Sequence, residues 1–177
     1  LTPRPFVLFS TGSNKRIELL VKAELDGALL ATFDFEADES MGKHARRKRT
    51  SVVFLQRQGL TLPRFFLRPQ WLGGRLDFLD RLFGAGAIRF PERRSFVTKF
   101  FVTGTEKSAI CRMFSNEVMD FCEAHSGWYI EGVKDTLICY RDGVVQSRSE
   151  HQQMAKESAV LFSRLAPIAA SVSGVTQ

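Results

Sequence analysis

The strongest constraint on the fold is a stretch in which apolar and acidic residues alternate. Residues 33–38 read Phe-Asp-Phe-Glu-Ala-Asp, a period of two that predicts a strand with one apolar face. Residues 40–43 predict a turn, and the β-branched run at 50–55 predicts a returning strand. The sequence therefore predicts an antiparallel hairpin in the N-terminal part of the chain.

The charges of this hairpin support two interpretations. Its second half carries the basic run Lys43, His44, Arg46, Arg47, Lys48 and Arg49. We favour a structural interpretation, in which acids of the first strand face bases of the second, each pair contributing roughly 0.2–1 kcal/mol. Residues 34–49 hold four acids and five Lys or Arg, so the segment has a net charge of only +1. The alternative is a site for the phosphate groups of lipid or nucleic acid, formed by Arg46, Arg47, Lys48 and Arg49.

The rest of the chain mixes helices with strands. Strands are predicted at 6–9, 62–68, 88–90, 99–103, 128–132 and 136–141, and residues 15–25 fit a strand or a helix. Helices are predicted from Pro69 to 83, from a cap at Thr105 to 124, and from Ser149 to Pro167 with Gln152 completing a capping box. This order predicts an α+β fold, with about three main helices packed on antiparallel sheet and the C-terminal helix last.

Length and composition bound the domain organisation. We expect a single α+β domain over residues 1–166, strand-rich over 1–68 and mixed over 69–166, followed by a flexible tail over 167–177. The 16 Phe residues can fill a dense core. Cys111, Cys122 and Cys139 are an odd set, so we expect reduced core residues rather than disulfides. Because the chain begins with Leu1 rather than Met, we expect it to be part of a longer protein.

No pattern in the sequence predicts an active site. There is no metal-ligand cluster, no glycine-rich phosphate loop, and no nucleophile placed with a base. The histidines are scattered, and His125 is expected to stabilise a helix C-terminus. We therefore expect no catalytic residue, no cofactor and no metal. An enzyme remains as an alternative only if residues distant in sequence form its site.

A second basic cluster consists of Arg89, Arg93, Arg94 and Lys99. Only Glu92 opposes it locally, and the whole chain carries a formal net charge of +6. A solvated surface is the favoured interpretation. Of the two basic clusters, this one is the better candidate for an anionic partner.

Several segments resemble one bacterial family. They are Phe33–Phe35, Thr50–Val53, Leu62–Pro69, Phe90–Pro91, Phe96, Phe100–Gly104, Met113–Phe114, Trp128–Gly132 and Leu137–Arg141. Over residues 6–166 the chain is similar to this family of hypothetical proteins of unknown function. Many of its members carry predicted membrane helices outside the similar part. The resemblance implies membrane association of the parent protein and supplies no catalytic residue.

Together these observations predict a non-enzymatic interaction domain. It would be the soluble part of a membrane-associated bacterial protein, on the cytoplasmic side, attached through segments outside this chain. We favour a protein partner over an anionic membrane surface, and nucleic acid is the least favoured. An anion-binding module that uses the basic clusters is the main alternative.

Overall fold

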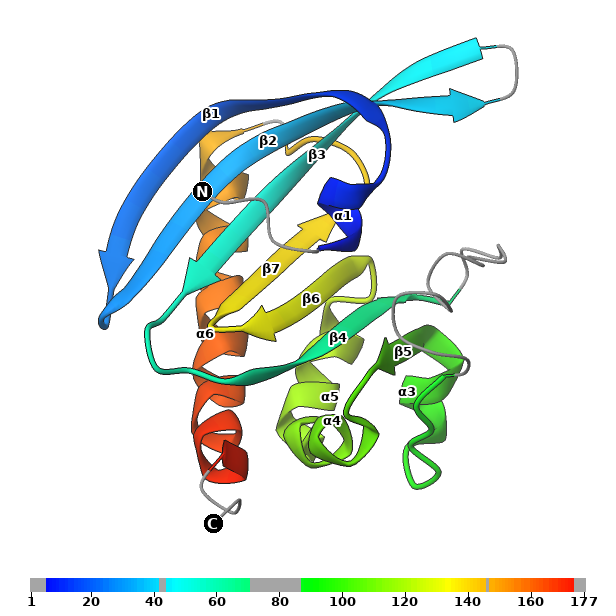
Figure 1. Cartoon of the computed structure of the whole chain (residues 1–177), viewed down its shortest axis with the longest axis vertical. Helices are drawn as coiled ribbons and strands as arrows, with labels where there is room; N and C mark the ends of the chain where they lie inside the picture. The colour runs from blue at the N-terminus through cyan, green and yellow to red at the C-terminus, as the bar shows by residue number, and fades with distance from the viewer. Residues whose placement is uncertain (1–5, 42–43, 71–86, 146, 174–177) are drawn as a thin grey trace.

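A computed structural model describes residues 6–41, 44–70, 87–145 and 147–173. Seven strands in these ranges form one sheet in the order β1-β2-β3-β7-β6-β4-β5, and every neighbouring pair is antiparallel (Figure 1). The strands are β1 Ser13–Leu25, β2 Ala28–Met41, β3 His44–Gln56, β4 Leu62–Pro69, β5 Phe100–Gly104, β6 Trp128–Lys134 and β7 Thr136–Arg141. The helices are α1 Val7–Ser10, α3 Arg94–Lys99, α4 Lys107–Met113, α5 Asn116–Ala124 and α6 Arg148–Ser173. The predicted α+β class, with a C-terminal helix last, is confirmed.

The predicted hairpin is β2 with β3. Its register places Glu36 opposite Arg49 and Asp38 opposite Arg47, so acids face bases across the two strands. The ambiguous stretch at 15–25 forms the edge strand β1, which pairs along β2 with an irregularity between Glu18 and Val21. The N-terminal and C-terminal halves share one sheet because β3 pairs with β7.

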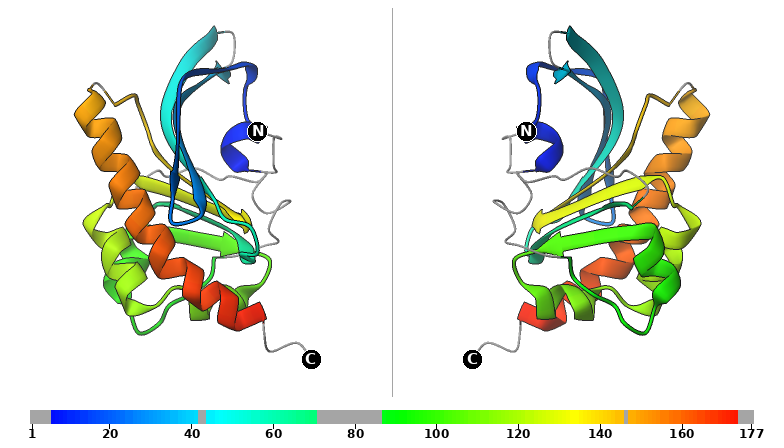
Figure 2. Two further views of the ribbon diagram at one scale, coloured as in Figure 1. Left: turned by 90° about the vertical axis from the view of Figure 1, so that its left-hand side faces the viewer. Right: turned by 90° about the vertical axis from the view of Figure 1, so that its right-hand side faces the viewer.

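Helices cover one face of this sheet. Figure 2 shows α6 and the other helices of the C-terminal half on one side, with α1 on the opposite side. The main core lies between these helices and the sheet, and it includes Phe65, Ile110, Leu137 and Leu161, all almost completely buried. Residues of α6 that were expected in the core are buried: Met154, Leu161, Phe162 and Leu165. In the described part of the chain, no helix is long and apolar enough to span a membrane.

The other side of the sheet, which we call the open face, carries a second apolar cluster. Five strands contribute to it through Ala31, Phe33, Phe35, Ala37, Val52, Phe54, Phe66, Val133, Ile138 and Tyr140. Residues Phe6, Val7, Leu8 and Phe9 of the N-terminal segment pack against this cluster. Among the described helices, only the four-residue α1 lies on this side (Figure 2).

The N-terminal elements differ from the sequence prediction in two places. Residues 6–9 were expected to form a strand, but Val7–Ser10 is one turn of helix. A four-residue apolar run has no periodicity that distinguishes these states, and tertiary contacts decide between them. Pro69 was expected to open a helix, but it is the last residue of β4, and residues 71–83 of that predicted helix lie outside the described residues.

In the middle of the chain, one expected helix is two. Residues 106–124 form α4 and α5, because Ser115 accepts a hydrogen bond from the Val118 N–H and so caps a new helix. Thr105 does not cap α4, whose N-cap is Glu106. Residues 88–90 are not a strand, although the Ile88 N–H donates to the Val102 carbonyl, and α3 was not predicted.

The last helix begins and ends differently from the prediction. Ser147, not Ser149, caps it, since the Ser147 Oγ accepts from the Glu150 N–H and the Glu150 carboxylate accepts from the Ser147 N–H. The helix continues through Pro167 to Ser173. A proline removes one backbone hydrogen bond but does not by itself end a helix.

Candidate functional site

A buried carboxylate links the open face to the N-terminal segment. Glu131 of β6 is only 1% exposed. Its Oε2 accepts a hydrogen bond from the Val7 N–H at 2.5 Å, and its Oε1 accepts from the Leu8 N–H at 3.0 Å. The Tyr140 hydroxyl of β7 donates to the same Oε1 at 2.8 Å. One side chain in the middle of the sheet thus binds the first turn of α1.

The environment of Glu131 perturbs its ionisation. Burial raises the pKa of the Glu131 carboxyl to about 7, while the hydrogen bonds from Tyr140, Val7 and Leu8 and the charge of Arg64 act in the opposite direction. The buried carboxyl therefore changes its charge near neutral pH. The docking of α1 is coupled to that proton, because α1 supplies two of the three hydrogen bonds.

Two tyrosines continue the site along the open face. The rings of Tyr129 and Tyr140 stack with centroids 4.9 Å apart and an interplanar angle of 5°. The Tyr129 hydroxyl donates to Oδ2 of Asp142 at 3.0 Å, and Oδ1 of Asp142 is 2.9 Å from the Lys48 ammonium. Burial, followed by the charge of Glu131, raises the pKa of Tyr140 well above its usual value. Tyr140 therefore remains a hydrogen-bond donor at neutral pH.

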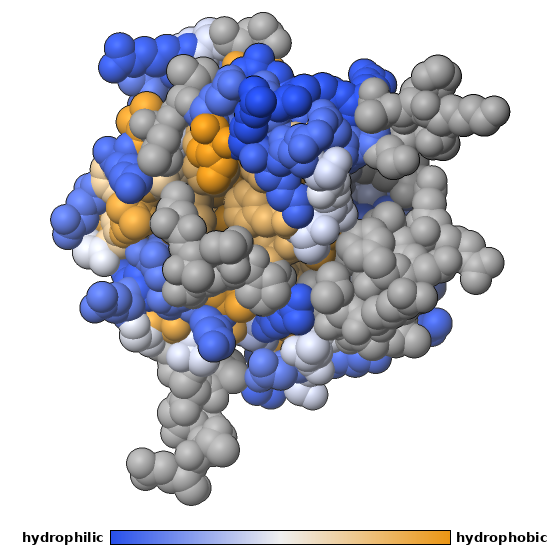
Figure 3. Space-filling model, turned by 45° about the horizontal axis from the view of Figure 1, so that its top comes forward, coloured by the Kyte–Doolittle hydropathy of each residue, from blue (hydrophilic) through white to orange (hydrophobic). Residues whose placement is uncertain are grey.

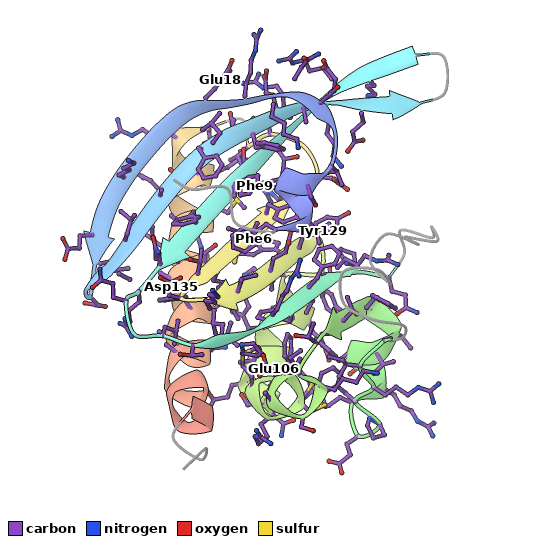
Figure 4. All side chains as sticks on the ribbon, viewed as in Figure 1. Phe6, Phe9, Glu18, Glu106, Tyr129 and Asp135 are labelled. Carbon is purple, nitrogen blue, oxygen red and sulfur yellow. The ribbon has the colours of Figure 1, made fainter. Side chains whose placement is uncertain are left out.

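Apolar contacts seat α1 beside these polar groups. The Phe9 ring lies 5.1 Å from the Phe35 ring and 6.2 Å from the Phe33 ring, and the Phe6 ring meets Phe9 edge-on at 5.9 Å. Phe6, Phe9 and Tyr129, labelled in Figure 4, all belong to or pack against the apolar cluster of the open face. Phe9 remains half-exposed, and Figure 3 shows apolar residues gathered in the middle of this side of the molecule between hydrophilic ones.

The first basic run is largely charge-paired, which confirms the favoured interpretation of the hairpin. The Arg49 guanidinium lies 2.6 Å from one carboxylate oxygen of Glu36 and 3.2 Å from one of Glu18. The Arg47 guanidinium lies 3.1 Å from the other carboxylate oxygen of Glu36. Lys48 pairs with Asp142. Burial acts to lower the pKa of Lys48, but the hydrogen bond and the charge of Asp142 raise this pKa overall.

The alternative use of this run as an anion site stays a prediction. Arg46 to Arg49 border an open groove of about 760 Å³ together with Glu39 and residues 142–144. Arg46 is exposed and makes no ion pair within the described residues. The side chain of His44 lies outside the described set.

The second basic cluster is more neutralised than its local sequence suggests. The Arg93 guanidinium lies 2.6 Å from a carboxylate oxygen of Asp120 and 3.1 Å from one of Glu123. The Lys99 ammonium lies 3.7 Å from the other carboxylate oxygen of Glu123. Both acids come from α5, more than 20 residues along the chain. Arg89 and Arg94 are exposed and form no ion pair in the part of the chain that the structure describes. The two basic clusters do not form one site, because α3 and the β2–β3 tip lie at opposite ends of the molecule (Figure 1).

The histidines and cysteines have structural surroundings. His125 follows α5, and its Nδ1 lies 2.7 Å from the Phe121 carbonyl, as expected for a residue at a helix C-terminus. All three cysteines are free, with Cys122 and Cys139 buried, but Cys111 is exposed rather than in the core. Within the described ranges, no group of three or more His, Cys, Asp or Glu side chains is placed to hold a metal.

Sequence reasoning did not single out Glu131. It is the one charged residue in the strand segment Trp-Tyr-Ile-Glu-Gly-Val, at a position where alternation with Tyr129 and Val133 directs it to an apolar face. An acid at such a position needs buried donors. That pattern could have marked Glu131, but the donors come from residues 7 and 8, which no local rule connects to β6.

Comparison with known proteins supports the fold. No family model and no curated protein matches the chain. A solved structure that does match is that of the mycobacterial trehalose monomycolate transport factor A, TtfA, with a TM-score of 0.59 and 17% sequence identity. The match covers 91% of this chain and 78% of that one. At this identity the likeness shows a shared fold.

Proposed function

We propose that this chain is a non-enzymatic interaction domain of a membrane-associated bacterial protein, and that the open face of the sheet is its interaction surface. The observation that carries the proposal is the asymmetry of the sheet. Helices α3 to α6 pack on one face, whereas α1, with four residues, is the one described helix on the other. An apolar face with such short cover is typical of a surface that meets a partner.

Two further observations support a binding role. Leu8, Phe9, Leu29 and Tyr129 pack at this face and remain half-exposed, so part of the apolar cluster reaches the surface. The structural neighbour is named as a transport factor, which agrees with a role in binding rather than in catalysis. Membrane association and the cytoplasmic side come from the family resemblance alone and are part of the proposal.

The test is a pair of charge insertions on opposite sides of the sheet. Leu29→Glu places a carboxylate at the half-exposed margin of the open face, and Val160→Glu does the same on the outer surface of α6, where Val160 is 45% exposed. Each variant is introduced into the full-length gene in the bacterium that encodes it. We expect Leu29→Glu to fail to complement a deletion and Val160→Glu to complement it, at equal abundance and melting temperature. Full complementation by Leu29→Glu would refute the proposal.

An anion-binding module remains a second candidate because of Arg89 and Arg94, which are exposed and without ion pairs in the described part. The test is co-sedimentation with neutral and anionic vesicles at low and physiological salt. Binding through these residues is expected only with anionic vesicles, falling steeply with salt. Combined Arg89→Glu and Arg94→Glu substitutions would abolish it, while Lys22→Glu with Lys156→Glu, an equal charge change at exposed positions elsewhere, would not.

A further inference from the structure

We propose that the surface beneath α1 is a peptide-binding site whose intramolecular occupant is residues 6–10. The partner that replaces them is a protein segment that presents aromatic and aliphatic side chains together with two free backbone N–H groups. This inference rests on the proposed function and names the chemistry of the partner that the open face would take.

The polar part of the recognition is made through backbone groups. Glu131 binds the consecutive N–H groups of Val7 and Leu8, which are unpaired in any helix because they belong to its first turn. A buried carboxylate left without donors costs at least as much as a lost hydrogen bond. The site therefore selects a chain with free N–H groups, such as the first turn of a helix, and disfavours a plain hydrocarbon surface.

The apolar part of the recognition sets the side-chain pattern. Phe6 is 1% exposed and Val7 is 5% exposed, and both join the cluster of the open face. Phe9 follows three residues after Phe6 and contacts Phe35. The occupant thus has aromatic side chains at the first and fourth positions and an aliphatic one at the second. These side chains flank the two N–H groups that bind the carboxylate.

The structure also shows why this occupant can be exchanged. A single helical turn has no stability of its own and depends on its docking contacts. Residues Thr11 and Gly12 connect α1 to β1, and Gly12 has a φ of +73° and lies close to Ala37. β1 is held separately by its pairing with β2, so α1 can leave without opening the sheet.

Ionisation of Glu131 biases the exchange in one direction. Burial under α1 raises the pKa of the carboxyl to about 7, and departure of α1 would return it to water and to a lower pKa. The docked state therefore binds the proton more tightly, and docking weakens as the pH rises from the lower, undocked pKa to about 7. Tyr140, Tyr129, Arg64 and Asp142 are the other ionisable groups around this site.

The experiment measures binding of a fluorescent peptide with the sequence of residues 3–14 to the full chain by anisotropy. In the wild-type chain the peptide competes with α1, so its apparent affinity is reduced by the fraction of open sites. Phe9→Ala in the chain weakens the intramolecular occupant and is expected to increase peptide affinity at least about tenfold. Val160→Ala, on the outer surface of α6, is expected to leave it unchanged. The same peptide carrying Phe9→Ala is expected to bind poorly to every variant.

Glu131→Gln keeps the shape of the side chain but offers one acceptor oxygen in place of two, so it is expected to weaken peptide binding to the Phe9→Ala chain. In the wild-type background it weakens α1 and the peptide alike, so the apparent affinity is expected to change little. Equal peptide affinity for wild type and Phe9→Ala would overturn the inference, as would binding to the Phe9→Ala chain that is unaffected by Glu131→Gln. Concentration-dependent dimers of the Phe9→Ala chain would identify a second copy as the occupant. Displacement of α1 by neutral vesicles would identify a lipid surface. Either result would also overturn it.

Hydrogen exchange of the wild-type chain gives a second measurement that does not depend on a variant. Excess peptide is expected to remove protection from the Val7 and Leu8 amides while β1 keeps its protection. Unchanged exchange at these amides would contradict displacement. If these tests fail while Leu29→Glu still abolishes complementation, the open face remains the interaction surface and only the peptide occupant is wrong.

Discussion

Glu131→Gln is expected to change how the stability of the protein depends on pH. In the wild type, the carboxyl lies in the sheet under α1 and accepts hydrogen bonds from Val7, Leu8 and Tyr140. Glutamine fills the same space and never ionises, but its amide nitrogen is a donor that would face a second donor, the N–H of Val7 or Leu8. The variant therefore separates the effect of the charge from the effect of shape.

The magnitude follows from the pKa of the buried carboxyl. Burial raises the pKa of Glu131 from 4.5 to about 7, which corresponds to at most about 3.4 kcal/mol at ~1.36 kcal/mol per pKa unit. Because the folded state binds the proton more tightly than the unfolded state, this contribution to stability is full below pH 4.5. It is lost as the pH rises through about 7. Between pH 5 and 9 the loss amounts to roughly 2.5 kcal/mol.

The assay is guanidinium unfolding of wild type and Glu131→Gln at pH 5, 6, 7, 8 and 9. The difference in unfolding free energy, wild type minus variant, cancels groups that both proteins share. It is expected to fall by about 2.5 kcal/mol between pH 5 and pH 9, because only the wild-type carboxyl releases a proton over this range. Glu117→Gln, the same substitution at an exposed position, serves as the control. A difference that is flat, or that grows with pH, for Glu131→Gln would refute the assignment of a proton-binding carboxyl at this site.

Three further outcomes are expected from the same structure. Arg49→Ala is expected to cost about 1–2 kcal/mol of unfolding free energy by denaturant titration, because Glu18, Asp34 and Glu36 lose the Arg49 cation, although Glu36 keeps Arg47. Arg46→Ala should stay within about 0.5 kcal/mol, and equal costs would argue against the charge pairing of the hairpin. Gly104→Ala places a methyl group 2.5 Å from a backbone oxygen and should lower the melting temperature by several degrees. Gly127→Ala, whose methyl meets nothing within 4 Å, should leave the melting temperature unchanged. Similar melting temperatures for the two variants would contradict the close packing at Gly104. Titration with a thiol reagent is expected to modify Cys111 alone in the native protein and all three cysteines after unfolding. A second reactive thiol in the native protein would show that Cys122 or Cys139 is accessible to the reagent.

The β2–β3 hairpin could be predicted because its determinants are local. The alternation of residues 33–38 and the β-branched residues of the returning strand at 50–55 determine which side of each strand is apolar. The register of the hairpin then places the acids of one strand opposite the bases of the other. The β6–β7 hairpin was predictable for the same reason. The long helix α6 was also evident, although its cap at Ser147 and its length beyond Pro167 were not.

The candidate site could not be predicted because its determinants are distant in sequence. Glu131 is paired with Val7 and Leu8 across more than 120 residues. A four-residue helix such as α1 depends on docking contacts for its stability, so local sequence does not predict it. The same limit applied to Arg93, whose acidic partners Asp120 and Glu123 come from α5. In each case tertiary packing brings together partners that are far apart in sequence, and a local sequence pattern cannot predict such pairs.

The pairing of β3 with β7 has a consequence for the order in which the protein forms during synthesis. Val52 pairs with Tyr140, so β1 to β3 emerge from the ribosome long before the strand that completes their edge. At ~5–20 residues per second the intervening segment takes on the order of 4–18 s to make. For that time the nascent hairpin displays an unpaired strand edge and an apolar face lined by phenylalanines. Residues 6–10 are already synthesised, but their anchor Glu131 is not, so the N-terminal segment cannot dock until the C-terminal strands arrive. The nascent chain is therefore a stronger client for chaperones than the finished protein, and its half-made sheet is the surface they would have to cover.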